Sequence, residues 1–456
     1  MKKYFFCSIL LSFISFFDLY AQVKFEEFSS LEKLLSKAKT EKKLVFVQIA
    51  SENCNQCNEV AQKGLSNSAL KEKFAINFLA TFIAHGGELY QQIMNKINVK
   101  DFSMGSLFLD EDGYLLLKSN TTTSYALNYL NNADQAISLS KNNVLKELDA
   151  QYPKEKGNKA FMKKLIQEKN KADFDTQSLV EEFIDLHTIK ELSSIENAKL
   201  IIEQGLPLES RARKQLYACF PKRTVDSLFR SYSLDERVKI NHKVINSTRQ
   251  IALKTKDKNL AVQLSSFISN TYDRNWEKGN FASQAFLTNF YKEIKDSTVF
   301  FLNAESFGTY NLMKMSIDTL KKREESERNA FMQQSRKNQS GNTIMSFSYS
   351  PYYIKYANEL NSIAYGYFTF TKDLEKLAKA LKWAKRAIEI HEALTPDESR
   401  KQNTKMMDTY ACLLYRLGKK EEAIDWETQA IEALKKRGEN TANLEANLNK
   451  IKKGEL

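Results

Sequence analysis

The sequence predicts a small α/β sandwich followed by a large all-helical region, and two observations carry this fold class. First, two short apolar runs, Leu44–Ala50 and Asn77–Ala84, alternate with segments of helical spacing, as buried strands between helices do. Second, the 456 residues include only fourteen glycines and five prolines, which excludes a collagen-like chain and disfavours an all-β fold with many turns. At roughly 100–200 residues per domain, the chain holds two or three domains.

The first 21 residues are typical of a secretory signal peptide. Two lysines precede an apolar run that ends at Phe17, and the small residue Ala21 suits the position before a cleavage site. The run is short for a membrane span, so an uncleaved anchor is the alternative. We therefore expect a protein exported to a bacterial periplasm, with no integral membrane segment after signal removal. Disulfides persist in that compartment.

The predicted sandwich occupies residues 22–150. Two predicted strands, Ser106–Leu109 and Tyr114–Leu117, form a hairpin, because the Asp-Gly pair in the turn Asp110–Gly113 adopts positive φ easily. Helical spacing predicts the helices between and around the strands, within residues 28–38, 54–64, 69–74, 88–97 and 125–139. Strands that alternate with helices and end in a hairpin favour a layered α/β domain.

The rest of the chain is predicted to be helical, in two parts. A polar break at residues 152–157 contains the first proline, and we expect a helical domain over residues 151–357. Within it, residues 335–352 have the composition of a long exposed loop. Residues 358–456 are expected to form helical repeats.

Small residues in this last part recur at regular intervals. They would allow two antiparallel helices to approach closely, and they are Ala364, Ala380, Ala387, Ala411, Gly418, Ala423 and Ala430. Their spacing resembles that of the tetratricopeptide repeat, over residues 404–437 and less closely over 358–392. Ordinary helical hairpins with alanine at the contact are the alternative. Two copies fall short of a free-standing solenoid, so the preceding helices would have to complete the core.

One short motif carries chemistry. Cys54 and Cys57 follow the strand Leu44–Ala50 and open a predicted helix, with Asn55 and Gln56 between them. The free N–H groups and the dipole of a helix N-terminus stabilise a thiolate. Cys54, at the helix mouth, would attack a substrate disulfide, and Cys57, one turn further, would resolve the mixed disulfide.

This combination of strand, Cys-x-x-Cys helix and hairpin resembles the thioredoxin superfamily over residues 25–140. The resemblance implies a thioredoxin-like sandwich and thiol–disulfide exchange, with Cys54 as the nucleophile and Cys57 as the resolving residue. The substrate loop would be Met104, Gly105 and Ser106. Three positions depart from the family pattern: Asn53 replaces an aromatic residue, Gln48 replaces a buried carboxylate, and Gly105 replaces a cis-proline.

Alternatives to a redox centre remain open from the sequence. Cys54 and Cys57 could form a structural disulfide in a binding domain. A metal site is disfavoured because a zinc site needs four ligands and no second cysteine pair is present. His85 would either modulate Cys57 or face solvent in a loop. The other cysteines and histidines are scattered, and Cys219 and Cys412 are most simply buried small residues, with a bridge between them as the alternative.

The positive charge is concentrated in the helical region. The chain has a net charge of +12, whereas residues 22–150 hold fourteen lysines against fifteen acidic residues. Export argues against nucleic acid as the partner, so the excess charge either attracts anionic lipids or cell-wall polymers or forms a solvated helical surface.

The function expected from the sequence is that of an exported thiol–disulfide oxidoreductase without a cofactor. Its helical region would dock protein clients that carry thiols or disulfides, and a redox partner protein would regenerate it. The alternative is a non-enzymatic interaction protein, in which the bond between Cys54 and Cys57 only stabilises a helix.

Overall fold

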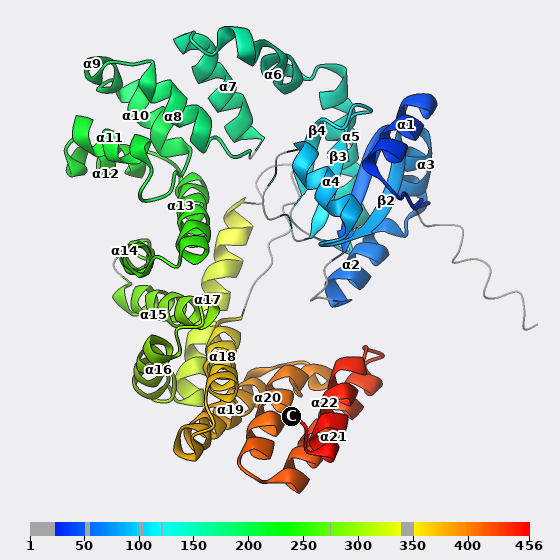
Figure 1. Cartoon of the computed structure of the whole chain (residues 1–456), viewed down its shortest axis with the longest axis vertical. Coiled ribbons are helices and arrows are strands. Elements are labelled where there is room, and N and C mark those ends of the chain that lie inside the picture. The colour runs from blue at the N-terminus through cyan, green and yellow to red at the C-terminus, as the bar shows by residue number, and fades with distance from the viewer. Residues whose placement is uncertain are drawn as a thin grey trace, which may run out of the picture. The chain divides into compact units, whose positions relative to one another are not determined.

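The computed structural model describes residues 23–50, 55–97, 99, 102, 104–119, 122–172, 174–273, 275–338 and 351–456 (Figure 1). The expected signal peptide therefore lies outside the described residues. The chain divides into two compact units. The sheet unit comprises the described residues up to Gln204 together with Lys214–Ser231, and the helical unit comprises Gly205–Arg213 and Tyr232–Leu456.

A four-stranded mixed sheet forms the centre of the sheet unit. Its strands are β1 (Leu44–Ala50), β2 (Phe78–Ala84), β3 (Gly105–Leu109) and β4 (Leu115–Ser119), in the order β2-β1-β3-β4. β1 is parallel to β2, and β3 is antiparallel to both β1 and β4. The predicted strands and hairpin are confirmed: β1 has the predicted bounds, and the other strands differ by at most two residues at either end.

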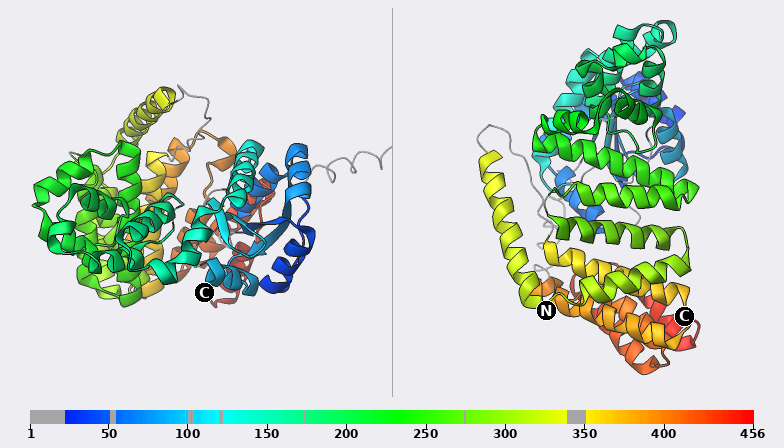
Figure 2. Two further views of the ribbon diagram at one scale, coloured as in Figure 1. Left: turned by 90° about the horizontal axis from the view of Figure 1, so that it is seen from above. Right: turned by 90° about the vertical axis from the view of Figure 1, so that its left-hand side faces the viewer.

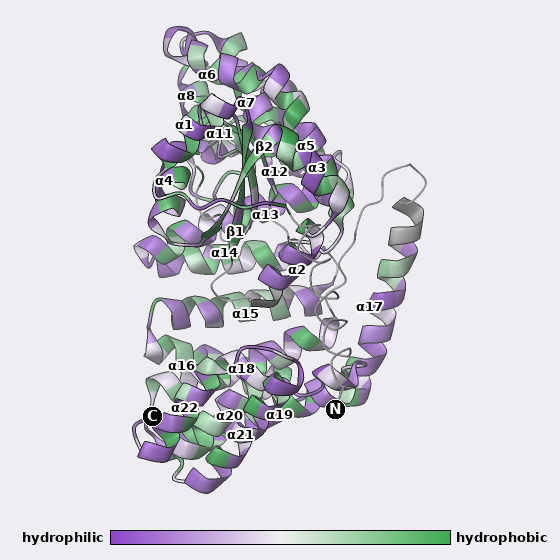
Figure 3. Ribbon diagram, turned by 90° about the vertical axis from the view of Figure 1, so that its right-hand side faces the viewer, coloured by the Kyte–Doolittle hydropathy of each residue, from purple (hydrophilic) through white to green (hydrophobic). Residues whose placement is uncertain are grey.

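Helices cover both faces of this sheet, so the predicted α/β layering is confirmed. On one face, Val45, Val47 and Ile49 pack against α1 (Leu31–Glu41) and α4 (Glu88–Ile97). The alternating residue Phe46 belongs to the core of the other face, which α2 (Asn55–Leu65), α3 (Ser68–Asn77) and α5 (Ala126–Lys141) cover. Because both faces are buried, the strands are almost continuously apolar, as their colour in Figure 3 shows.

Six further helices and most of a seventh continue the sheet unit. The six are α6 (Val144–Glu155), α7 (Lys159–Lys171), α8 (Gln177–Asp185), α9 (Ile189–Leu192), α10 (Ile195–Glu203) and α12 (Lys222–Arg230), and the seventh is α11 (Arg211–Cys219), whose first three residues belong to the helical unit. α6 runs through Pro153 and ends at Glu155, so the predicted break is shorter than expected. Residue 150, the expected domain boundary, lies inside α6. Polar contacts attach this helix to the hairpin: the Tyr114 hydroxyl donates to Asp149 at 2.6 Å, and Lys146 pairs with Asp110 at 2.7 Å.

The helical unit begins with consecutive helices that pack on one another: α13 (Leu234–Thr255), α14 (Lys258–Asn270), α15 (Trp276–Glu293) and α16 (Ser297–Ser306). In the right-hand view of Figure 2 they form successive green tiers. A π-helical turn (Phe307–Leu312) follows, and then α17 (Ile317–Asn338). The predicted loop over residues 335–352 is therefore wrong for residues 335–338, which belong to α17, and for Tyr352, which begins the next helix, while 339–350 lie outside the described residues.

Helical hairpins close the chain, which confirms the large all-helical region. They are formed by α18 (Tyr352–Phe370), α19 (Leu374–Leu394), α20 (Thr404–Arg416), α21 (Lys420–Lys436) and α22 (Ala442–Lys453). Ala411, Ala423 and Ala430 have no exposed surface, as expected for alanines between close helices. Gly418 differs, since it lies in the α20–α21 turn with φ +78° and nothing near its missing Cβ. Its role is backbone conformation, not close approach.

No helix among the described residues has the length and apolarity that crossing a membrane requires.

Candidate functional site

The candidate site lies at the sheet edge where β1 and β2 end and β3 begins. Ala50 pairs with Ala84 across the parallel strands, and Ile49 pairs with Gly105 on the antiparallel side. The His85 backbone N–H donates to the Ala50 carbonyl at 3.2 Å, which holds the ends of β1 and β2 together. Four residues separate the end of β1 from the start of α2. We call this region the thiol edge, meaning residues 48–50, 55–57, 84–85 and 104–106.

The cysteine motif is only partly within the described residues. Asn53 and Cys54 lie outside them, and the side chains of Asn55 and Gln56 are not described, although both residues open α2. Cys57 is the third residue of α2 and is half-buried and disulfide-bonded. The structure therefore places Cys57 in the first turn of a helix that follows a buried strand. The assignment of Cys54 as nucleophile remains a prediction.

Gln48 occupies a fully enclosed position beneath this edge. Only 1 % of its surface is exposed, and it belongs to the β1 face that α2 covers. Its Nε2 donates to the Gly105 carbonyl at 2.9 Å, and its Oε1 accepts from the Ser106 hydroxyl at 2.7 Å. Both halves of the amide are therefore satisfied by the predicted substrate loop. A buried carboxylate at this position could not donate to Gly105 unless it were protonated.

The predicted substrate loop consists of the residue that precedes β3 and the first two residues of that strand. Gly105 has φ +119°, a conformation that favours glycine, and no cis peptide bond occurs among the described residues. Met104 is half-buried, whereas Ser106 has no exposed surface. The carbonyl of Gly105 points at Gln48, so this group is already hydrogen-bonded inside the protein.

His85 is held by packing contacts, unlike the solvent-facing loop histidine that was the alternative. It is half-buried, and its ring centroid lies 4.7 Å from that of Tyr90 on α4. The Tyr90 hydroxyl donates to the Phe102 carbonyl at 3.1 Å, just before the predicted substrate loop. His85, Tyr90 and the loop before β3 therefore form one packed group at the thiol edge.

The other candidates do not join this edge. Cys412 is buried, and burial raises the pKa of its thiol, while Cys219 is half-buried at the end of α11. Both cysteines are free, so the alternative bridge between them is absent. His391 is buried in the helical unit, where burial lowers its pKa. No group of three or more metal-ligating side chains occurs within the described part of the chain.

Sequence patterns missed two polar groups, one half-buried and one largely buried. One is the contact of Tyr114, Asp149 and Lys169 in the sheet unit, where the Lys169–Asp149 pair measures 2.8 Å. The other is the carboxyl pair of Asp408 and Glu427, in which Glu427 has no exposed surface. Hydrophobic periodicity along the sequence could not reveal either group, because each group combines residues from separate segments of the chain. The only signal that the sequence offered for either group was an acidic residue within an amphipathic helix.

Comparison with known proteins adds no assignment, because no family model matches the chain and no curated protein matches it either.

Proposed function

We propose that the protein is an exported thiol–disulfide oxidoreductase of thioredoxin type, in which Cys54 attacks a client disulfide and Cys57 resolves the mixed disulfide. One observation supports this function most: Cys57 lies in the first turn of α2, directly after the buried strand β1, at the same edge as the loop before β3. Backbone N–H groups and the dipole of a helix N-terminus favour a thiolate there.

The chemistry of the proposed cycle balances without a cofactor. The Cys54 thiolate attacks one sulfur of the client disulfide, and the other client sulfur leaves as a thiolate that takes a proton. The Cys57 thiolate then attacks Cys54, forms the Cys54–Cys57 disulfide and releases the second client thiol. The client is reduced by two electrons and the cysteine pair is oxidised. A redox partner protein returns the pair to its dithiol form.

Client docking would fall to the helical unit. Its tetratricopeptide-like hairpins, α18–α19 and α20–α21, have the alanine contacts expected for helical repeats. Repeats of this kind present extended surfaces to protein segments. The proposed compartment is the bacterial periplasm, where a thiol–disulfide exchange protein finds oxidised clients.

A second candidate function is a non-enzymatic interaction protein with a structural disulfide. The hydrogen bond from Gln48 Nε2 to the Gly105 carbonyl favours it, because that carbonyl is not free for a substrate backbone. Gln48 is also unable to accept a proton in the way a buried carboxylate could.

Trapping and redox titration separate the two functions. A Cys57→Ser variant of the full chain should accumulate mixed disulfides through Cys54, and a Cys54→Ser, Cys57→Ser variant is the control. The wild type should also reduce insulin with dithiothreitol as electron donor. A reduction potential far below about −300 mV, the range of resistant structural disulfides, together with no trapping and no turnover, would establish the second function.

A further inference from the structure

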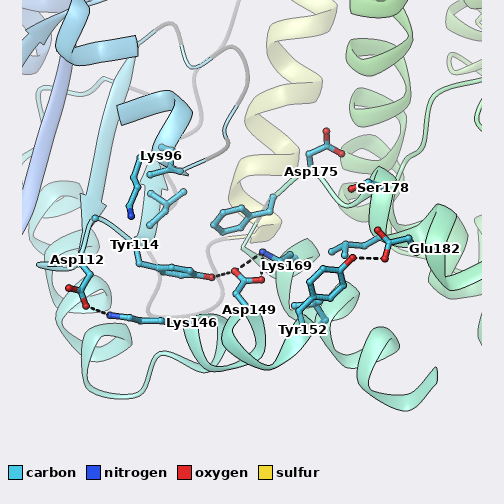
Figure 4. A pocket seen from close by; sticks show the side chains of 16 residues that line it. Lys96, Asp112, Tyr114, Lys146, Asp149, Tyr152, Lys169, Asp175, Ser178 and Glu182 are labelled. Atoms are coloured by element: carbon cyan, nitrogen blue, oxygen red, sulfur yellow. Dashed lines mark hydrogen bonds and ion pairs between the residues drawn. The ribbon is translucent and has the colours of Figure 1, made fainter. Parts of the chain in front are cut away.

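A pocket of about 510 Å³ lies within the sheet unit, away from the thiol edge (Figure 4). It is partly open and is lined by the β3–β4 turn, the end of α4, and helices α6, α7 and α8. β3 begins at the thiol edge and ends at this pocket. The volume falls within the range of roughly 300–1,000 Å³ that is usual for small-ligand sites.

Most of the charged groups that line the pocket satisfy one another. Asp149 accepts from the Tyr114 hydroxyl at 2.6 Å and pairs with Lys169 at 2.8 Å. Lys146 pairs with Asp112 at 2.7 Å, and this lysine and Lys39 lower the pKa of Asp112 to about 2. These groups form a fixed frame around the pocket and leave no charge for a ligand to neutralise.

One cation at the pocket has no internal partner. Lys96, near the end of α4, makes no hydrogen bond or ion pair with the described residues. Its stem lies against Gly113, because a Cβ added to that glycine would come within 3.4 Å of Lys96 Cε and 2.9 Å of Leu35 Cδ1. Gly113 also has φ +80°, so the close approach and the turn both require glycine.

An uncompensated anion lies across the pocket from Lys96. Glu182 on α8 accepts a hydrogen bond from the Tyr152 hydroxyl, a neutral donor, and pairs with no cation among the described residues. Figure 4 shows Lys96 and Glu182 on opposite sides of the pocket. The same pocket is also lined by apolar side chains, which form its apolar wall: Ile97, Leu115, Leu165, Phe174 and Leu179.

We propose that this pocket binds a short peptide with free termini, its carboxylate at Lys96, its ammonium group at Glu182 and its apolar side chains against the apolar wall. The two open charges have opposite sign and lie at opposite ends, which fits a zwitterion. The apolar wall fits leucine-like side chains. A pocket of this volume has room for more than one amino acid. This ligand site is independent of the thiol chemistry proposed above.

Calorimetric titration of the full chain with trileucine tests the proposal. The matched probes are N-acetyl-trileucine, trileucine amide and free leucine. Trileucine should bind saturably, and each capped peptide should bind roughly fivefold more weakly, the effect of losing one partly exposed ion pair. Free leucine should bind more weakly than trileucine, because it cannot reach both charges.

Charge-neutral variants assign each end of the ligand. Lys96→Gln should weaken trileucine binding roughly fivefold and remove the difference between trileucine and its amide. Glu182→Gln, which can still accept from Tyr152, should remove the difference between trileucine and its N-acetyl form. Lys164→Gln on α7 is the control, because Lys164 is exposed, makes no hydrogen bond or ion pair with the described residues and does not line the pocket.

Several outcomes would overturn the proposal. They are no saturable binding up to roughly 10 mM trileucine, capped peptides that bind as tightly as the free one, and Lys96→Gln binding that equals that of Lys164→Gln. If leucine bound more tightly than trileucine, the ligand would be a free amino acid and the peptide proposal would be wrong. The capped-peptide comparison uses the wild-type protein, so it holds even where a variant folds poorly.

Discussion

At the scale of single residues, Gln48 links β1 to the first residues of β3 at the thiol edge. Its amide donates to Gly105 and accepts from Ser106, and the side chain is almost wholly enclosed. A buried amide with both of its groups satisfied fixes a loop more firmly than apolar packing alone. Gln48 is therefore a positioning residue for the first residues of β3.

We expect Gln48→Ala to destabilise the sheet unit by about 1–3 kcal/mol, because it leaves the Gly105 carbonyl and the Ser106 hydroxyl buried without partners. Thermal unfolding of the full chain measures the loss. Gln91→Ala is the control, since the Gln91 side chain is exposed on α4. Equal unfolding temperatures for the two variants would show that the Gln48 bonds do not hold the loop.

The sequence singled out Gln48 and Gly105 as departures from the thioredoxin pattern but did not predict that they meet. The antiparallel pairing of β1 with β3 brings them together. The hydrogen bonds between them could not be anticipated, because residues 57 positions apart share no sequence period. His85 illustrates the same limit, since its contact with Tyr90 depends on how the β2–α4 turn closes.

At the scale of helices, close approach in the helical unit depends on Gly366 of α18. A Cβ at this position would lie 2.3 Å from Cζ of Phe300, a ring that is fully buried on α16. The ring also packs edge-to-face on Tyr367 and Phe370. Phe300 therefore has no free volume into which it could move.

We expect Gly366→Ala to destabilise the helical unit by about 1–3 kcal/mol through overpacking, despite the higher helix propensity of alanine. Denaturant unfolding provides the measurement. Gly157→Ala is the matched control, because nothing lies within 4 Å of the Cβ it would add. A Gly366→Ala variant as stable as the control would mean that α16 and α18 separate readily.

The Asp408–Glu427 pair predicts a pH dependence of stability. Burial and the neighbouring Asp408 raise the pKa of Glu427, which can then donate a hydrogen bond to Asp408. Asp408 also accepts from Asn447 Nδ2 at 2.9 Å. An acid whose pKa is raised by folding stabilises the fold below its ordinary pKa, and this contribution is lost as pH rises toward the raised value.

The helical unit should therefore be less stable at pH 8 than at pH 5, and Glu427→Gln should remove much of that difference. At pH 8 we expect the variant to be more stable than the wild type by at least about 1 kcal/mol, the equivalent of roughly one pKa unit. Thermal unfolding at the two pH values tests this. Glu432→Gln, at an exposed position of α21, should keep the wild-type pH slope.

Secondary structure was predictable here because continuous apolar runs mark the buried strands and helical spacing marks the amphipathic helices. The strand β1 was expected with the bounds that it has, and α20–α21 were expected from the alanine spacing. The end of α17 was missed because residues 335–338 are polar, and exposed polar helices lack an apolar stripe. Gly418 was assigned to a helix contact, although a glycine before a helix start can equally provide a turn.

At the scale of the whole chain, composition suggested a boundary near residue 150, whereas the compact unit extends further. α6 is attached to the β3–β4 hairpin through Asp149 and Lys146, which contact residues 35 and 36 positions earlier. Such contacts between distant residues leave no trace in composition. Pro153, which lies inside α6, also favoured the wrong prediction of a break at this point.

The division into units predicts a local effect for Asp149→Ala. Its loss leaves the Tyr114 hydroxyl and Lys169 without their shared partner, at a cost of about 1–3 kcal/mol. We expect faster hydrogen exchange in peptides from β3–β4, α6 and α7, measured by mass spectrometry. Peptides from α18 to α21 should exchange as in the wild type. An equal change in both units would show that they unfold together.

The two free cysteines among the described residues provide one thiol in each unit whose reaction rate reports local opening. Cys219 is half-buried in the sheet unit, while Cys412 is enclosed in the helical unit with a thiol whose pKa is raised by burial. A thiol reagent needs an accessible thiolate. Cys219 should therefore be alkylated before Cys412, and Cys412 should react only as often as its helices open. The lag between the two reactions would record the opening of the helical unit in the unmodified chain.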